Sequence, residues 1–191
     1  MLRLYRGKEI MLLDDVYDPG EDSFLLVDAA LAEVKKDEKV LEIGTGSGIV
    51  SMFLKDMADV VATDINPEAC RNARLNGVTV VRADLFSGIC GRFDLVIFNP
   101  PYLPTSEGER VEGWLNKAFD GGPDGRLVID AYIERLPFML SPGGRALVVI
   151  STLTDVDAVA RRFREHGFTV EEVGELKVCF EKLVVLKAMM A

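Results

Sequence analysis

The chain has 191 residues, 49% of them hydrophobic, so it can bury one sizeable core and is expected to form a single domain. Its 31 acidic and 22 basic residues give a formal net charge of −9, which repels phosphate backbones and disfavours nucleic acid as a partner. Three scattered cysteines and one histidine, His166, make neither a disulfide scaffold nor a metal site, so no metal is expected.

The N-terminal part is expected to form an arm, a helix, a strand and a second helix. No basic-then-apolar leader and no apolar stretch of membrane-spanning length is present, so a cytoplasmic protein without a membrane partner is expected. From Asp22, apolar residues recur three and four apart, which predicts an amphipathic helix with the acidic start GEDS. The run KVLEI (39–43) predicts a strand, GTGSG (44–48) a tight turn, and IVSMFLKDMA (49–58) the next helix.

The rest of the chain continues the alternation of strands and helices. Asn66 as N-cap, Pro67 at the first helical position and Gly77 as the stop predict a helix after the strand VVATD (60–64). The later elements are expected to be strands at VTVVRAD (78–84) and FDLVIFN (93–99), a helix at 124–140 that ends or breaks near Pro137, an SPGG turn (141–144), a strand at RALVVIS (145–151), a helix at 156–167, and strands within 168–176 and 177–188.

This order predicts an α/β fold: a mostly parallel seven-stranded sheet covered by helices on both faces. The last two strands are joined by too short a connection for a crossover helix, so they are expected to form an antiparallel hairpin. Residues 1–36 would form the arm and first helix, and residues 37–191 the catalytic core of one domain, 1–191. Ligands of such sheets bind outside the carboxyl ends of the strands, where the strand order reverses.

The glycine turn and the acids that follow the strands suggest a nucleoside site. Glycines at 44, 46 and 48 do not fit Gly-x-Gly-x-x-Gly, which needs one at position 49, so the spacing argues against NAD. They still permit close backbone approach to a ligand, and Asp64 ends the next strand, where acids commonly bind ribose hydroxyls. Glu42, an acid inside an apolar strand, is expected to be paired or to reach a cationic end of the ligand. Asp84 could bind an adenine amino group beside Leu85, or be a solvated loop acid.

The stretch FNPPYLPT (98–105) is unusually rigid for a segment that follows a strand. Two consecutive prolines fix φ, and Asn99 before a proline favours extended backbone. The loop can therefore hold the Asn99 side-chain oxygen and the Pro100 carbonyl oxygen as two acceptors for one planar –NH2 group, with Tyr102 covering its flat face. Such a site suits transfer of a group to a weakly nucleophilic nitrogen.

The combination LEIGTGSG, TDINPEA, ADLF and FNPPY resembles class I S-adenosylmethionine-dependent methyltransferases of the HemK type, with a Rossmann-like fold. These enzymes methylate the side-chain amide of a glutamine in peptide-chain release factors. VYDPGEDSFLL and GGPDGRLVID are similar to the short archaeal and eukaryotic branch, whose target glutamine lies in a Gly-Gly-Gln tip. The alternative is a DNA or RNA methyltransferase acting on adenine N6 or guanine N2, whose targets are also planar amines.

The resemblance also implies roles for individual residues. The NPPY residues Asn99, Pro100, Pro101 and Tyr102 would be catalytic, and S-adenosylmethionine, which leaves as S-adenosylhomocysteine, would be held by Tyr17, Ser23, Glu42, Gly44, Gly46, Gly48, Asp64, Ile65, Asp84, Leu85 and Asn99. The bacterial members carry an additional N-terminal helical domain, which is not expected here because only about forty residues precede the glycine turn. In the short branch a small zinc-binding protein activates the enzyme, so a partner of that kind is expected besides the release factor. The basic run RRFREHG (161–167) is either an exposed helix face or a nucleic-acid contact.

Overall fold

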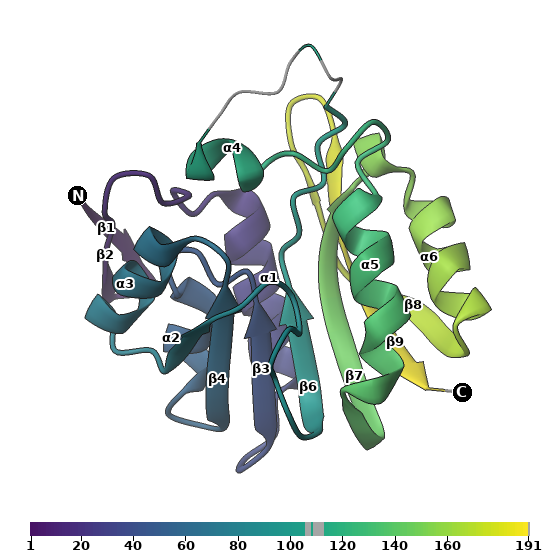
Figure 1. Cartoon of the computed structure of the whole chain (residues 1–191), viewed down its shortest axis with the longest axis horizontal. Coiled ribbons are helices and arrows are strands. Elements are labelled where there is room, and N and C mark those ends of the chain that lie inside the picture. The colour runs from purple at the N-terminus through teal and green to yellow at the C-terminus, as the bar shows by residue number, and fades with distance from the viewer. Residues whose placement is uncertain (106–107, 109–112, 191) are drawn as a thin grey trace.

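A seven-stranded sheet forms the centre of the computed structural model, which describes residues 1–105, 108 and 113–190 (Figure 1). In order across the sheet, the strands are β5 (Val80–Arg82), β4 (Asp59–Asp64), β3 (Lys39–Ile43), β6 (Phe93–Phe98), β7 (Leu140–Ser151), β9 (Lys182–Met190) and β8 (Phe168–Lys177). The first five run parallel, whereas β9 pairs antiparallel with both β7 and β8. The expected sheet and its closing hairpin are confirmed.

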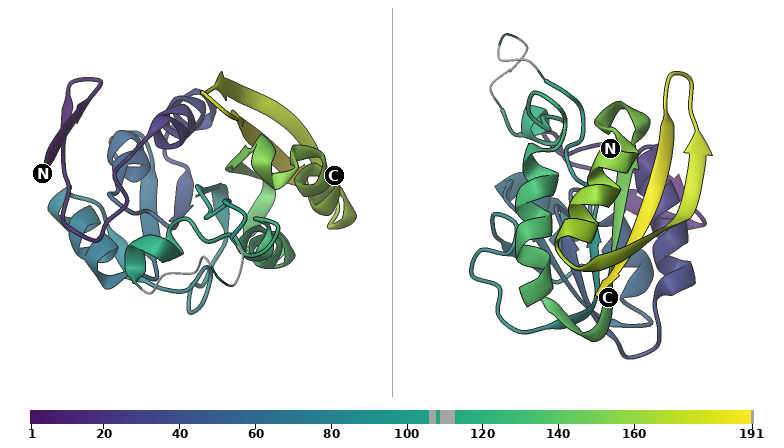
Figure 2. Two further views of the ribbon diagram at one scale, coloured as in Figure 1. Left: turned by 90° about the horizontal axis from the view of Figure 1, so that it is seen from above. Right: turned by 90° about the vertical axis from the view of Figure 1, so that its right-hand side faces the viewer.

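Helices cover both faces of this sheet, as Figure 2 shows in two further views. They are α1 (Glu21–Glu33), α2 (Ile49–Leu54), α3 (Pro67–Leu75), α5 (Leu127–Arg135) and α6 (Val156–Glu165). The short helix α4 (Trp114–Lys117) lies instead above the carboxyl ends of the strands (Figure 1). Alternate side chains of β6 divide the core: Leu95 and Ile97 pack with α1 and α2, and Val96 and Phe98 pack with α5 and α6. This two-sided burial explains why the strands read as continuous apolar runs. Among the described residues, no helix is long and apolar enough to cross a membrane.

Three elements differ from the expectation. Helix α2 ends at Leu54 instead of residue 58, because the KDMA segment that follows is largely exposed and supplies no apolar face. Strand β5 has only three residues. The SPGG segment (141–144), expected as a turn before the strand, lies inside β7 as an irregularity. Phe93 of β6 pairs with Leu140 and Leu95 pairs with Arg145, so residues 141–144 interrupt the regular pairing of the two strands.

The N-terminal arm contains a hairpin that the sequence reasoning missed. Strands β1 (Leu2–Tyr5) and β2 (Lys8–Met11) pair antiparallel around Arg6 and Gly7, which both have positive φ, 46° and 78°. Two-residue turns of that kind match the twist of a hairpin, and Gly7 between LRLY and KEIM was the only part of the usual turn signal present, since Arg6 is not among the residues favoured at the first turn position. Tyr5 stacks on Phe24 of α1 with ring centroids 4.2 Å apart, so the arm is anchored to the domain.

Two asparagines of the α3 region tie this arm to the glycine turn. The Asn72 and Asn76 side-chain amides both donate to the Met11 and Ser47 carbonyl oxygens, at 2.8–3.0 Å. In return, Asn72 Oδ1 accepts the Leu13 N–H at 2.7 Å. The segment after β2 is thereby fixed beside the sheet, and it leads directly to Tyr17 and α1.

Candidate active site

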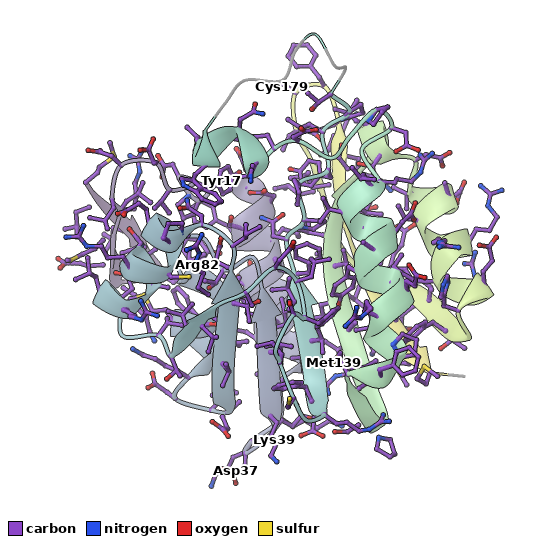
Figure 3. All side chains as sticks on the ribbon, viewed as in Figure 1. Tyr17, Asp37, Lys39, Arg82, Met139 and Cys179 are labelled. Carbon is purple, nitrogen blue, oxygen red and sulfur yellow. The ribbon has the colours of Figure 1, made fainter. Side chains whose placement is uncertain are left out.

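A cavity of about 500 Å³ lies at the carboxyl ends of the parallel strands, beside β3, where the strand order reverses. Figure 3 shows Tyr17 beneath α4, and Cys179 at the tip of the β8–β9 turn above the same edge of the sheet. The sequence-predicted residues that line it are Tyr17, Ser23, Glu42, Gly44, Gly46, Asp64, Ile65, Asp84, Leu85, Asn99, Pro100, Pro101 and Tyr102. Gly48 is not among the lining residues.

Each glycine of the GTGSG turn is required by a different feature of the structure. Gly44 has φ +62°, and a Cβ there would lie 3.2 Å from the Phe98 ring, so its absence lets the turn approach the residue before Asn99. Gly46 has φ +54° and open space beside it. Gly48 has φ +85°, and a Cβ there would lie 3.1 Å from the Ala73 backbone. Gly48 therefore serves the packing of α2 against α3, and we place it outside the cavity.

Glu42 is buried beneath the glycine turn and holds it together. Its Oε2 accepts the Thr45 hydroxyl at 2.8 Å, the Ser51 N–H at 3.0 Å and the Ser51 hydroxyl. Burial nevertheless raises the pKa of Glu42 to about 7, with the nearby Asp64 charge acting in the same direction. The acid is thus paired within the fold and lines the cavity as well.

Asp64, at the end of β4, has both carboxylate oxygens oriented by backbone donors. Oδ2 accepts the Gly46 N–H at 2.9 Å, and Oδ1 accepts the Asn66 N–H at 2.8 Å. Burial raises the pKa of Asp64, and the backbone hydrogen bonds partly offset this rise. Each oxygen keeps a second lone pair for a donor inside the cavity, as hydroxyl recognition requires.

Asp84 and Leu85 form the wall that follows β5. Asp84 is exposed, so of the acids named above it is the one that solvent reaches freely. Leu85 has a positive φ of 47° and is half-buried against the core under α5. That backbone conformation is uncommon for a non-glycine residue and turns the chain sharply behind Asp84.

A buried hydrogen-bond centre connects α1 with the NPPY segment, and the sequence reasoning missed it. Asp22 is 5% exposed, and its carboxylate accepts the Tyr17 hydroxyl at 3.0 Å and the Ser23 N–H at 2.6 Å. It also accepts the Asn99 amide Nδ2 at 2.9 Å and the Tyr102 hydroxyl at 3.4 Å. GEDS predicted only an acidic helix start, and the available signal was an acid three and four residues before the apolar positions Leu25 and Leu26 of the same helix.

This contact fixes the orientation of the Asn99 side chain. A carboxylate accepts hydrogen bonds and donates none, so the amide nitrogen of Asn99 has to face Asp22 and its Oδ1 faces elsewhere. Burial, with Asp22 next, raises the pKa of both Tyr17 and Tyr102, so both phenols keep their protons at neutral pH. The side chains around Asp22 therefore offer the neutral amide oxygen of Asn99 as an acceptor. Neither Tyr17 nor Tyr102 can act as a base at neutral pH.

The segment GGPDG (121–125) supports the NPPY loop from outside. A Cβ on Gly121 would lie 2.8 Å from the Pro101 carbonyl oxygen, and one on Gly125 2.4 Å from the Tyr102 carbonyl oxygen. The Thr154 hydroxyl also donates to the Tyr102 carbonyl oxygen at 3.0 Å. The Pro100 carbonyl oxygen accepts no hydrogen bond within the described ranges, so it is free for a ligand.

Helix α4 and the residues after it add an aromatic cover that the sequence did not suggest. Trp114 lines the cavity, with the Lys117 ammonium 4.7 Å and the Arg82 guanidinium 5.8 Å from its ring centroid. Phe119 meets the Tyr17 ring edge to face, with centroids 5.3 Å apart. The cover joins the wall near Asp84 to the Asp22 centre.

The lining is strongly acidic. Its acids are Asp15, Glu21, Asp22, Glu42, Asp64, Asp84, Asp120 and Glu181, and Lys117 is the only base that lines it in the described part of the chain. This charge favours a cationic ligand and opposes phosphate. In the basic run on α6, Arg162 lies 3.6 Å from both Asp130 and Glu165, while Arg161 and Arg164 are exposed, so the run forms an exposed helix face outside this cavity.

Comparisons with known proteins find similar methyltransferases. The model of the methyltransferase small domain family matches residues 14–179. A candidate protein N5-glutamine methyltransferase of Methanocaldococcus jannaschii is 43% identical, with 95% of each chain covered. The human methyltransferase HEMK2 is 37% identical over 91% of this chain and 89% of its own. The fold is also similar to E. cuniculi Mtq2, solved in the Mtq2-Trm112 complex that methylates the termination factor eRF1, with TM-score 0.79, 30% identity and coverage of 93% of this chain and 99% of that one.

Proposed function

The chain belongs to the methyltransferase small domain family, and from this we infer that it transfers a methyl group from S-adenosylmethionine to the side-chain amide nitrogen of a glutamine in a translation release factor. The observation that carries the choice of a planar –NH2 group is the fixed amide of Asn99, whose Nδ2 donates to Asp22 at 2.9 Å. It leaves one neutral acceptor beside the free Pro100 carbonyl oxygen, as a planar –NH2 group needs. We assign the whole of residues 1–191 to this single catalytic domain.

The two acceptors act on the substrate nitrogen as follows. Asn99 Oδ1 and the Pro100 carbonyl oxygen each take one N–H, which orients the nitrogen and excludes water from it. As the nitrogen gains a bond it becomes more positive, so both hydrogen bonds strengthen in the transition state. The methylated nitrogen returns to neutrality by releasing one of its two protons to solvent after the transfer. The rigid Pro100-Pro101 backbone keeps the acceptors in place without reorganisation, and Tyr102 covers the planar group.

The residues that line the cavity fit the cofactor. When bound, S-adenosylmethionine supplies a methyl group activated by its sulfonium charge. Asp64 would hold the ribose hydroxyls, Asp84 and Leu85 the adenine, and Glu42 the cationic amino-acid end, near the glycine turn. The acidic lining and the volume of about 500 Å³ both suit a cationic ligand of this size.

The entrance of the cavity is less compatible with a base of DNA or RNA than with a protein segment. A flipped base brings its flanking phosphates to the rim of the site. Here the rim carries exposed Glu21 and Asp84, which repel phosphate. A protein segment brings no such charge, so we favour the glutamine over the adenine N6 or guanine N2 target.

The function is tested with purified protein, labelled S-adenosylmethionine and the release factor of the same organism. We expect one methyl group on the glutamine of the Gly-Gly-Gln tip, located by mass spectrometry, and no label when that glutamine is replaced. Preferential labelling of purified RNA or DNA under the same conditions would select the nucleic-acid alternative.

Asp64→Ala is expected to weaken cofactor binding by about 1.5–3 kcal/mol, the range for hydrogen bonds to a charged group. The variant also removes the acceptor of the Gly46 N–H, so the turn loses an anchor. Binding can be followed by the emission of Trp114, the only tryptophan of the chain, which lines the cavity. Asp59→Ala, exposed at the opposite end of β4, is the matched control, and unchanged affinity in Asp64→Ala would remove Asp64 from the site.

Cofactor binding is expected to depend on pH through Glu42. The pKa of Glu42 is about 7 in the folded protein and 4.5 in the unfolded chain. The free protein therefore loses stability as the pH rises from 4.5 to about 7, because the unfolded chain ionises first. A cationic ligand favours the ionised form of Glu42, so binding below about pH 7 should release up to one proton from this residue. The affinity should therefore increase as the pH rises toward 7, by at most about tenfold per pH unit. Calorimetry at pH 6.5 in buffers of different ionisation enthalpy measures the proton. Glu42→Gln should abolish the release, and an unchanged release would assign it to another group.

We also propose a small zinc-binding activator of the Trm112 type. The similar solved structure is a complex with Trm112. In this chain β5 is a sheet edge, and Val81 and Leu75 beside it are 46% and 49% exposed, so an apolar surface is available there. Co-expression should give a one-to-one complex with higher activity than the isolated chain. A soluble isolated chain with full activity on the release factor would contradict this proposal.

A further inference from the structure

The turn between β8 and β9, residues 178–181, lies beyond the carboxyl end of β7 (Figure 1). It contributes to the lining of the cavity and takes no part in the mechanism above. It is closed by the Val178 N–H, which donates to the Glu181 carbonyl oxygen at 3.0 Å. At its base the Lys182 N–H donates to the Thr152 hydroxyl oxygen at 3.0 Å, which ties the hairpin to the end of β7. The turn is therefore held in a defined place.

One side of this turn points into the site. Val178 and Glu181 line the same cavity as Asn99 and Tyr102. Glu181 Oε2 is buried and has no hydrogen-bond partner among the residues that the structure describes. The Glu181 charge acts on Tyr102, whose pKa it helps to raise, so the two groups are near each other. A buried acceptor without a donor is costly and uncommon, and a ligand that brings the donor would account for it.

The other side of the turn points outward. Phe180 is 96% exposed, the highest value for a large apolar side chain among the described residues. A single exposed aromatic residue is not by itself a site. Here it is adjacent in sequence to the unpartnered carboxylate, so the turn offers a polar contact inside the cavity and an apolar contact outside it. An occupant that uses both has to extend from the cavity to the surface, as a side chain carried on a protein loop does.

We propose that the 178–181 turn binds the protein segment that carries the target glutamine: Glu181 Oε2 accepts a hydrogen bond from that segment, and Phe180 packs against its apolar surface. The inference rests on the function proposed above. It adds a substrate-binding element that is contributed by the C-terminal hairpin and is separate from the NPPY acceptors. A negatively charged acceptor at this place would also oppose a nucleic-acid substrate.

The test compares Glu181→Gln and Phe180→Ala with the unaltered protein, using the release factor as substrate. Glu181→Gln keeps an oxygen acceptor but loses the negative charge that strengthens the hydrogen bond, so it should raise the KM for the release factor by about fivefold to tenfold. Phe180→Ala should raise the same KM severalfold, and Phe180→Leu should restore most of it. In all three variants kcat and the cofactor affinity measured by Trp114 emission should stay near the unaltered values, since neither residue is assigned to the reacting atoms.

Glu175→Gln is the matched control. Glu175 lies on the same hairpin, is exposed and pairs with Lys182 at 3.0 Å outside the cavity, so its KM should not change. Unchanged KM in both Glu181→Gln and Phe180→Ala would overturn the inference, and so would a fall in cofactor affinity or melting temperature that accounts for the effect. If the unaltered protein does not methylate the release factor, the proposed function itself fails. If the unaltered protein is active and the variants have the same KM, only the role of the 178–181 turn fails.

Discussion

Asn99→Ala is expected to lower the rate of methyl transfer by on the order of 10²-fold or more, the scale for losing one aligned polar contact to a transition state. The Asn99 oxygen is aimed because its amide nitrogen donates to Asp22 at 2.9 Å. Alanine removes that acceptor and leaves Asp22 with its tyrosine and backbone donors, so the fold should persist. The measurement is kcat on the release factor, together with cofactor affinity by Trp114 emission, which should change little.

Asp22→Ala is the companion variant for Asn99. It keeps the Asn99 oxygen but frees the amide to rotate, so activity should fall less than in Asn99→Ala while the cofactor still binds. Near-normal turnover in Asn99→Ala would contradict the two-acceptor mechanism. Loss of activity that simply follows loss of cofactor affinity would instead move Asn99 from catalysis to cofactor binding.

Gly125→Ala is expected to disrupt the NPPY loop although residue 125 lies outside it. Its φ of +76° is strained for alanine, and the added Cβ would lie 2.4 Å from the Tyr102 carbonyl oxygen, so the loop or the GGPDG segment has to move. The left-handed backbone alone costs about 1–2 kcal/mol, and the clash adds to it. We expect a melting temperature lower by roughly 4–8 °C, the shift for about 2 kcal/mol in a domain of this size, and a larger loss of kcat than of cofactor affinity.

Gly143→Ala separates the two causes. Gly143 has the same φ of +76° but nothing within 4 Å of a Cβ, and it lies in the SPGG irregularity at the start of β7. It should show the backbone cost with unchanged kcat. Equal kcat in both variants would mean that contact with the Tyr102 carbonyl oxygen does not position the catalytic loop.

The order of the seven sheet strands and of the long helices between them could be predicted from the sequence, whereas the β1–β2 hairpin and α4 could not. Two-sided burial of a parallel sheet produces apolar runs such as KVLEI and FDLVIF, and capping residues such as Asn66 and Pro67 act within one turn of chain. These signals are local, so the seven-stranded sheet, the antiparallel hairpin and the carboxyl-end location of the site followed from them. Where no apolar face or cap marks an end, as after Leu54, the predicted boundary was wrong by several residues.

The contacts among the site residues could not be predicted, because they join segments that are far apart in the sequence. Asp22 meets Asn99 across 77 positions and Tyr102 across 80, and no local pattern encodes which distant side chain a buried carboxylate will accept from. No local pattern shows that Gly48 is needed for the packing of α2 against α3, or that the β8–β9 hairpin brings Glu181 to the cavity. The physical reason is that strand and helix patterns depend on neighbours in sequence, whereas hydrogen-bond partners and steric limits depend on neighbours in space.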